Sequence, residues 1–334
     1  MKQTTDNMTQ EEITGRCPMA KIDTIADKIV VYIRRHLEKK YPGKKPLRVF
    51  HTKTIGLVKG LLKVKDGLPA DLKKGLFQKE ETYKIWIRFT NGNPSVTDDK
   101  TKAARGMAIK IMSVTSSRFL DDDPEGNTQD IILFTSRTFA PGVADYQPDG
   151  VKLVIPRGLN FIKSAITIIR HAFKGSLPFL RSVRIQVPNV LEENYYSGTP
   201  YSFGADRAIK WHASPLKTIT SLMPEKPRKD FLKERLTDDL STGAKEEVAF
   251  GLYVQFQENE HTEPVDNSSV LWETPFHQVG TILLPKQNLA SDEMDQRITF
   301  SPGHSMVEHA PLGGVNMVRR KAYAILSAER LAHS

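Results

Sequence analysis

Residues 82–94, TYKIWIRFTNGNP, decide the fold class. Along this stretch bulky apolar side chains alternate with basic or polar ones, so that the two kinds fall on opposite faces. The first face carries Tyr83, Ile85, Ile87 and Phe89, and the second carries Lys84, Trp86, Arg88 and Thr90. A period of two predicts a β-strand. The run Asn-Gly-Asn-Pro that follows predicts a turn at its end.

The same period recurs outward from this strand. Five further stretches show it: RGMAIKIM (105–112), DIILF (130–134), RAIKWHAS (207–214), EVAFGLYVQFQ (247–257) and VGTILLP (279–285). Roughly six to eight strands are therefore expected, mostly joined by turns, which favours an antiparallel barrel or sandwich. Several strands carry bulky residues on both faces, and this favours a barrel whose interior is filled or holds a ligand.

Helical periodicity flanks the predicted barrel. Apolar residues recur at helical spacing from Ile22 to Leu37, and Tyr41-Pro42-Gly43 ends that helix. Residues 158–174 and about 316–332 show similar stripes. We therefore predict an α+β protein with a flexible arm over 1–20 and a single domain over 21–334. Its barrel covers about 45–290 and its C-terminal helices about 305–332.

Composition narrows the class of protein. The chain has 334 residues, of which 39% are hydrophobic and 26% charged, as in soluble globular proteins. It contains no run of 18 apolar residues and no secretory signal at its start, so we expect a cytoplasmic protein. Cys17 is the sole cysteine, which excludes an intrachain disulfide framework.

The net charge of +9 is concentrated in one block. Residues 151–191 contain seven Lys or Arg residues and no Asp or Glu. Such a block is a solvated basic face, or it meets anionic lipid, nucleic acid or an acidic ligand. Peripheral membrane contact through 158–184 is one reading, and packing of that helix on the barrel is the other. Because no nucleic-acid-binding motif accompanies the block, no nucleic-acid partner is expected.

Candidate site residues begin in the segment RVFHTK, residues 48–53. This segment places His51 in a β-prone run, three residues after Arg48. Arg88 and Thr90 share one face of the strand over 82–91, and Arg105 begins the next strand. Arginines directed into a barrel are costly unless they meet an anion. A carboxylate ligand would offset that cost, because a guanidinium group pairs with it through two hydrogen bonds.

Several segments, in the same order along the chain, resemble segments of haem catalases. RVFHTK resembles the distal-histidine strand of that family, and IRFTNG (87–92) resembles its Val-Arg-Phe-Ser strand. DDKTKAARGMAIKI (98–111) is similar to its Asp-x-x-Arg-Gly-Phe-Ala-Val-Lys-Phe motif, and DIILFTSRTF (130–139) to the strand that bears the distal asparagine. YSFGADRAIKWHAS (201–214) resembles the continuation of the barrel. The resemblance runs from about Arg48 to Asn316, without the flavodoxin-like extension of large catalases.

The resemblance implies a catalase-like antiparallel barrel with haem b as cofactor. It assigns His51 as the distal acid/base and Thr90 as the group that orients it. It assigns Arg48 and Arg88 to the haem propionates, with Arg105 in support. The implied activity is that of an oxidoreductase acting on hydrogen peroxide or on an organic or fatty-acid hydroperoxide, or that of an enzyme that rearranges such a hydroperoxide. The alternative is a catalase-fold protein that binds haem or an anionic lipid without redox turnover.

The chain departs from the family on both sides of the expected haem. Thr135 occupies the position of the distal asparagine, so weak disproportionation of hydrogen peroxide is expected. With HAPLGGVN aligned on the Leu-Gly of catalases, His304 falls on the tyrosinate ligand and Phe300 on the arginine four residues before it. His304 is then either a replacement iron ligand or a packing residue. Assembly into a homo-oligomer, as in large catalases, is also left open.

Overall fold

The computed structural model describes residues 18–43, 48, 51–93, 95–115, 119, 124–139, 181–217, 220–244 and 247–333. Most of the arm predicted over 1–20, the predicted helix over 158–174 and most of the basic block lie outside these residues. The described part begins almost at once with helix α2, Met19–Lys40.

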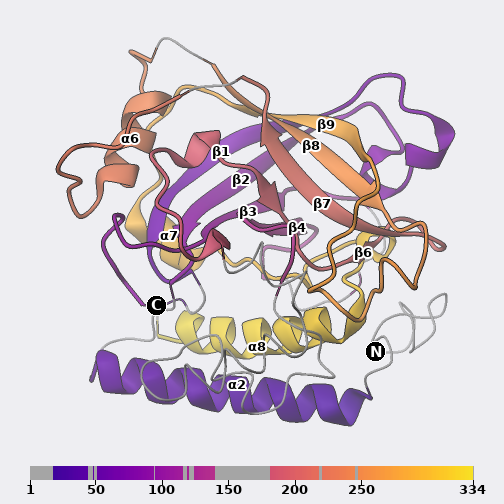
Figure 1. The fold of residues 1–334 in the computed structure, drawn as a ribbon, viewed down its shortest axis with the longest axis horizontal. Helices are drawn as coiled ribbons and strands as arrows, with labels where there is room; N and C mark the ends of the chain where they lie inside the picture. Colours follow the sequence, from indigo (N-terminus) through magenta and orange to yellow (C-terminus); the bar gives the residue numbers. More distant parts are fainter. Residues whose placement is uncertain are drawn as a thin grey trace.

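The centre of the molecule is a closed antiparallel barrel, as the alternating sequences predict (Figure 1). Eight strands pair in the order β5-β4-β3-β2-β1-β9-β8-β7, and a β5–β7 pairing closes the ring. The short strand β6 is added beside β7. The strands are β1 Thr54–Val64, β2 Thr82–Asn91, β3 Arg105–Ile111, β4 Gln129–Phe134, β5 Tyr195–Tyr196, β6 Tyr201–Ser202, β7 Ala208–Pro215, β8 Val248–Phe256 and β9 Phe276–Leu284.

Apolar side chains fill the barrel. The face of β2 that carries Ile85, Ile87 and Phe89 belongs to the interior cluster, as do Met107 and Ile109 of β3. The prediction of a filled interior is thus confirmed for the described residues. The expectation that arginines point into the barrel is wrong for Arg88, because the alternation places it on the outer face of β2.

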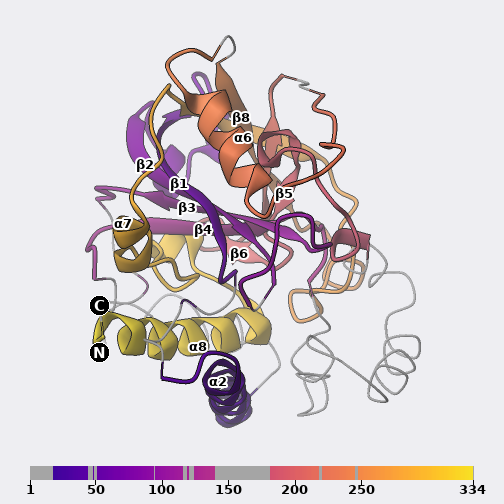
Figure 2. The same ribbon diagram turned by 90° about the vertical axis from the view of Figure 1, so that its left-hand side faces the viewer.

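Helices α6 (Phe231–Leu240), α7 (Asp292–Arg297) and α8 (Gly313–Leu331) lie outside the barrel. Short 3₁₀ turns are η1 Ala70–Leu72, η2 Gly75–Phe77, η3 Val190–Glu192 and η4 Val307–His309. Figure 2 shows α8 between the barrel and α2. The C-terminal region predicted to be helical from about 305 forms a 3₁₀ turn and then a single helix.

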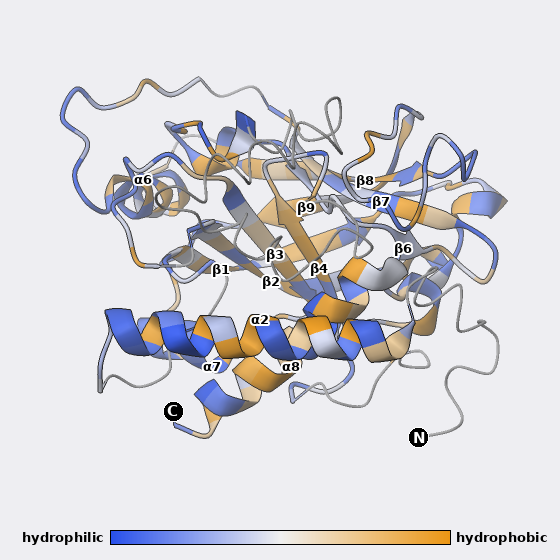
Figure 3. Cartoon of the chain, turned by 60° about the horizontal axis from the view of Figure 1, so that its bottom comes forward, coloured by the Kyte–Doolittle hydropathy of each residue, from blue (hydrophilic) through white to orange (hydrophobic). Residues whose placement is uncertain are grey.

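Helices α2 and α8 pack through a shared apolar cluster. Apolar side chains repeat along α2 (Figure 3), and its buried face, including Ile25 and Ile29, meets Val318 and Ala322 of α8. Charged pairs flank this contact. Lys321 lies 3.0 Å from Asp23, and Glu329 of α8 pairs with Arg34 of α2. Glu329, which interrupts the apolar stripe of the sequence, therefore faces α2 as an ion-pair partner.

No helix in the described ranges is both long and apolar enough to span a membrane.

Candidate functional site

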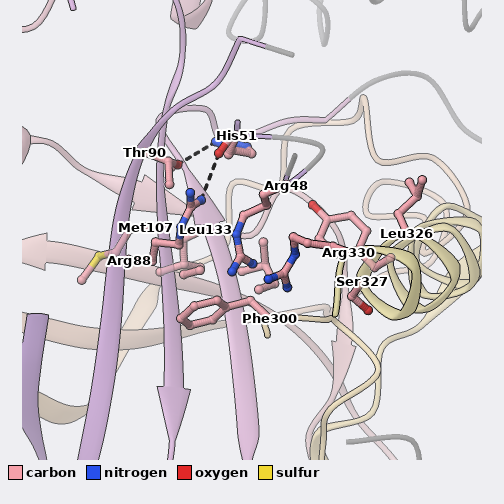
Figure 4. A pocket seen from close by; sticks show the side chains of 14 residues that line it. Arg48, His51, Arg88, Thr90, Met107, Leu133, Phe300, Leu326, Ser327 and Arg330 are labelled. Carbon is pink, nitrogen blue, oxygen red and sulfur yellow. Dashed lines mark hydrogen bonds between the residues drawn. The ribbon is translucent and has the colours of Figure 1, made fainter. Parts of the chain in front are cut away.

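A pocket lies between the outer face of β2–β4 and helix α8 (Figure 4). His51, Arg88 and Thr90 line its sheet side, and Tyr323 and Arg330 line its α8 side. Its cavity measures about 60 Å³. The further lining residues are Arg48, Gly106, Met107, Ala108, Ile132, Leu133, Phe300, Leu326 and Ser327. Four of the residues predicted from the sequence, His51, Thr90, Arg48 and Arg88, thus meet in one place.

His51 stands just before β1 in a backbone conformation that few side chains adopt. Its φ is +56°, in the left-handed region, which costs a non-glycine residue about 1 kcal/mol or more. The prediction that Arg48 and His51 lie on one strand is therefore wrong: β1 begins only at Thr54. The left-handed residue turns the chain and aims the imidazole at the pocket instead of along a sheet.

Three neighbours fix the ring and backbone of His51. Thr90 Oγ1 lies 2.8 Å from His51 Nδ1, and Arg88 Nη1 donates a hydrogen bond of 2.9 Å to the His51 carbonyl (Figure 4). Gly106 lies against the imidazole, so closely that a Cβ there would come within 2.5 Å of His51 Nδ1. β2 and β3 therefore supply an orienting hydroxyl, a cationic anchor and a gap that only glycine leaves open.

The electrostatics of the pocket keep His51 uncharged. Burial lowers the pKa of His51 to about 3, and the positive charges of Arg88 and Arg319 act in the same direction. At neutral pH the imidazole is therefore neutral. It can accept a proton, as a general base must, on whichever ring nitrogen Thr90 leaves free.

Three buried guanidinium groups accompany one buried carboxylate beside His51. Arg88 Nε and Nη2 pair with the two carboxylate oxygens of Asp295 at 2.7 and 3.3 Å. Arg48 Nη2 donates to the carbonyls of Asp295 and Ile298 at 2.6 and 2.5 Å. Arg330 is only 4% exposed, and among the residues that the structure describes its Nη1 and Nη2 have no hydrogen-bond partner, as is the case for Nε of Arg48.

The arginine cluster is short of negative charge. Burial, followed by the charges of Arg88 and Arg330, lowers the pKa of Arg48 well below its ordinary value. Burial and Arg88 likewise lower the pKa of Arg330, while Asp295 opposes them. Unpaired N–H groups of a buried cation are costly, so the cluster favours an anion. A carboxylate or phosphate group would supply both the charge and the acceptors.

Tyr323 is the pocket residue that sequence reasoning missed. It lies on α8 and lines the same cavity as His51. The signal was present, because Arg319-Arg320-Lys321-Ala322-Tyr323 places an arginine four residues before a tyrosine. That is the spacing of the catalase ligand motif, but alignment on Leu-Gly directed attention to His304. Arg319 Nη1 donates 3.0 Å hydrogen bonds to Thr199 Oγ1 and Asn316 Oδ1.

The structure does not bring His304 to this pocket. His304 is 5% exposed, and its Nδ1 lies 3.2 Å from Asp130 Oδ2. Lys110 Nζ pairs with the other carboxylate oxygen of Asp130 at 2.8 Å. His304 is absent from the pocket lining and belongs to a buried polar network on β3 and β4. Among the residues that the structure describes, no three His, Cys, Asp or Glu side chains gather as a metal site.

Thr135 and Arg105 also lie apart from the pocket lining. Arg105 shares the inner face of β3 with Met107, and its Nη2 donates to the carbonyls of Asp99 and Thr101 at 2.9 and 3.2 Å. Thr135 Oγ1 accepts a 3.0 Å hydrogen bond from the Arg105 backbone N–H. Thr135, predicted as a catalytic residue, and Arg105, predicted to bind the cofactor, are therefore bonded to each other at the start of β3.

Comparison with solved structures places this architecture. The chain is similar to a fungal catalase (17% identity, TM-score 0.62), to catalase A from Saccharomyces cerevisiae (16%, 0.65) and to a bacterial catalase (16%, 0.63). Each match covers 90% of this chain and 62%, 64% and 60% of the respective catalase. The chain therefore has a catalase-like fold and spans about three fifths of the length of these enzymes. No family model and no curated protein sequence matches it.

Proposed function

We propose that this protein binds haem b in the pocket between β2–β4 and α8 and processes a peroxide there. One observation carries the proposal: His51 and Thr90 share this cavity with the unbonded N–H groups of Arg330. An acid/base and an anion-binding group thus face the same small space. The likeness to catalases supports a peroxide-related function at the level of the fold.

The charges of the pocket suit this cofactor. Arg48, Arg88 and Arg330 carry three positive charges; Asp295 pairs with Arg88, and the charge of Glu125 also acts on Arg48 and Arg330. The cluster keeps an excess of positive charge, and the two carboxylates of haem b would supply negative charge and accept the unpaired hydrogen bonds. Arg48 and Arg330 would hold these carboxylates, whereas Arg88 is already paired with Asp295.

Tyr323 is the residue we propose as iron ligand, in place of His304. A tyrosinate is an established haem ligand. Arg319 lies four residues earlier on the same helix, at the spacing of the catalase ligand motif. The position of His304 beside Asp130, outside the pocket lining, argues against the earlier assignment.

The cavity is small and is not fully enclosed. Ligand pockets typically hold about 300–1,000 Å³. The 60 Å³ cavity is smaller, so uptake of haem requires α8 and the sheet to move apart. Binding is therefore expected to change the α8 contacts, including those with α2.

Bound haem would supply the redox chemistry that cleaves the O–O bond of a peroxide. The chain's own contribution is proton transfer. Neutral His51 accepts a proton from the peroxide oxygen that approaches it and returns it to the departing oxygen, while Thr90 holds the ring in place. Thr135, bonded to the Arg105 backbone, is not placed to assist, so weak disproportionation of hydrogen peroxide is expected.

Hydroperoxide consumption by hemin-loaded protein tests the proposal. Hydrogen peroxide and a fatty-acid hydroperoxide would be compared for wild type, His51→Gln and His261→Gln, the last an exposed histidine far along the chain. We expect turnover that His51→Gln lowers about 100-fold or more and that His261→Gln leaves unchanged. Equal turnover in all three would refute the assignment of His51.

The alternative is binding without turnover. The small volume of the cavity and the unbonded N–H groups of Arg330 would also suit the carboxylate end of an anionic lipid. Stoichiometric uptake of a fatty acid, with no hydroperoxide consumption by hemin-treated protein, would favour this second function.

A further inference from the structure

The backbone of His51 is held in place by one side chain of β2. A φ of +56° is strained for a histidine and persists only where the surroundings fix it. Thr90 contacts the ring, but Arg88 contacts the backbone, through Nη1 and the His51 carbonyl at 2.9 Å. The direction of the Arg88 guanidinium therefore decides where the His51 main chain lies.

Asp295 sets that direction. Its two carboxylate oxygens take Nε and Nη2 of Arg88, which is one complete edge of the guanidinium plane. With that edge engaged, Nη1 points to the His51 carbonyl. A planar fork bonded at two points cannot rotate about its end. Asp295 itself is 2% exposed and does not line the pocket, so it has no direct contact with a ligand there.

Helix α7 fixes Asp295 in turn. Ser291 caps the helix by accepting a 3.2 Å hydrogen bond from the Met294 N–H. Arg48 Nη2 binds the backbone carbonyl of Asp295 at 2.6 Å. The chain Asp295–Arg88–His51 thus connects a capped helix to the histidine across more than 200 residues of sequence.

We propose that Asp295 is a positioning residue, which holds His51 in its working conformation through Arg88. The inference rests on the proposed role of His51 as acid/base, and it deepens that function. It concerns hydrogen bonds within the chain, so its test needs no cofactor.

The test uses the protein without haem, labelled with ¹⁵N at histidine, with the His51 ring signals assigned through His51→Gln. Asp295→Asn removes the charge at nearly constant volume. Asp292→Asn is the matched control, since Asp292 lies on the same helix, is exposed, and pairs only at the surface with Lys233 at 3.1 Å. We expect Asp295→Asn to shift or broaden the His51 signals and Asp292→Asn to leave them in place.

A second variant covers the case in which Asp295→Asn fails to fold with Arg88 left unpaired. Arg88→Gln/Asp295→Asn removes both charges together and leaves no buried ion without its partner. It is expected to displace the His51 signals as Arg88→Gln does alone, because the two residues act as one unit. Asp295→Glu, which keeps the carboxylate, is expected to restore part of the wild-type signal.

Unchanged His51 signals in folded Asp295→Asn, or in the double variant, would overturn the inference. Failure of hemin binding would refute the proposed function and leave this result standing, because the measurement contains no haem. In hemin-loaded protein, cyanide association gives an independent readout. The proton of hydrogen cyanide would pass to His51, so Asp295→Asn is expected to slow cyanide association toward the rate measured for His51→Gln.

Discussion

Replacement of Arg330 by methionine separates the stability of the pocket from its proposed function. Arg330 is a buried residue of α8. Methionine keeps much of its apolar stem and removes a guanidinium whose Nη1 and Nη2 have no partner within the described part of the chain. Leaving a buried polar group unsatisfied costs about 1–3 kcal/mol, and more for a charged one. Removal of this charge also relieves its repulsion with Arg48 and Arg88, which contributes to the lowered pKa values of Arg48 and Arg330.

We therefore expect Arg330→Met to stabilise the protein without haem by about 1–3 kcal/mol. The affinity of Arg330→Met for hemin, in contrast to its stability, should fall. A hydrogen bond to a charged group contributes about 1.5–3 kcal/mol, so affinity should drop about tenfold to somewhat over a hundredfold.

Urea unfolding measures the first effect and hemin titration the second. Arg297→Met is the control, because Arg297 is an exposed arginine of α7 that pairs only with Glu293. It should change neither quantity appreciably. An Arg330→Met protein that is less stable than wild type and binds hemin equally well would refute the account of an anion site.

Three further outcomes follow from the contacts of the site. Gly106→Ala places a Cβ 2.4 Å from Thr90 Oγ1, about 1 Å inside ordinary contact, so it should lower the free energy of unfolding by about 1–3 kcal/mol and displace the His51 ring. Gly243→Ala, whose Cβ would meet Ser241 Oγ at 3.9 Å, an ordinary contact, should do neither; equal unfolding midpoints for the two variants would contradict this. Thr90→Val should keep the fold but release the imidazole of His51 from its 2.8 Å contact. We expect a changed His51 ring signal with an unchanged circular dichroism spectrum; an unaltered ring signal would mean that this contact does not orient the imidazole. Burial lowers the pKa of His309 to about 4, so below about pH 6.5 the unfolded chain binds a proton at this histidine that the folded chain does not bind. The free energy of unfolding should therefore fall by about 1.4 kcal/mol for each unit by which the pH is lowered from 6.5 to 4. His309→Gln should reduce that slope in urea unfolding, and an unchanged slope would exclude a contribution of His309.

The barrel could be predicted from the sequence because alternation is a local signal. The inner face of β2 and the strands around it follow from side chains two residues apart. The same pattern could not tell which side of the sheet the pocket occupies. The alternation correctly groups Arg88 with Thr90 on one face of β2, but it does not show that this face is the outer one. Only the packing of α7 and α8 decides that the outer face is covered.

The rest of the site depends on contacts between distant segments. His51 lies before β1 with a positive φ, and no residue preference in RVFHTK predicts this conformation. Asp295 meets Arg88 across 207 residues, and no spacing rule connects them. Tyr323 is different: its arginine four residues earlier was readable, and it was missed because one motif, Leu-Gly, fixed the alignment.

Hemin titration of the purified protein, followed by absorption at the Soret band, tests the central claim most directly. Wild type, Tyr323→Phe and His304→Ala would be compared. We expect one hemin per chain, with a spectrum that changes or is lost in Tyr323→Phe and is retained in His304→Ala. No stoichiometric uptake by wild type, or a spectrum that responds to His304→Ala and not to Tyr323→Phe, would contradict it.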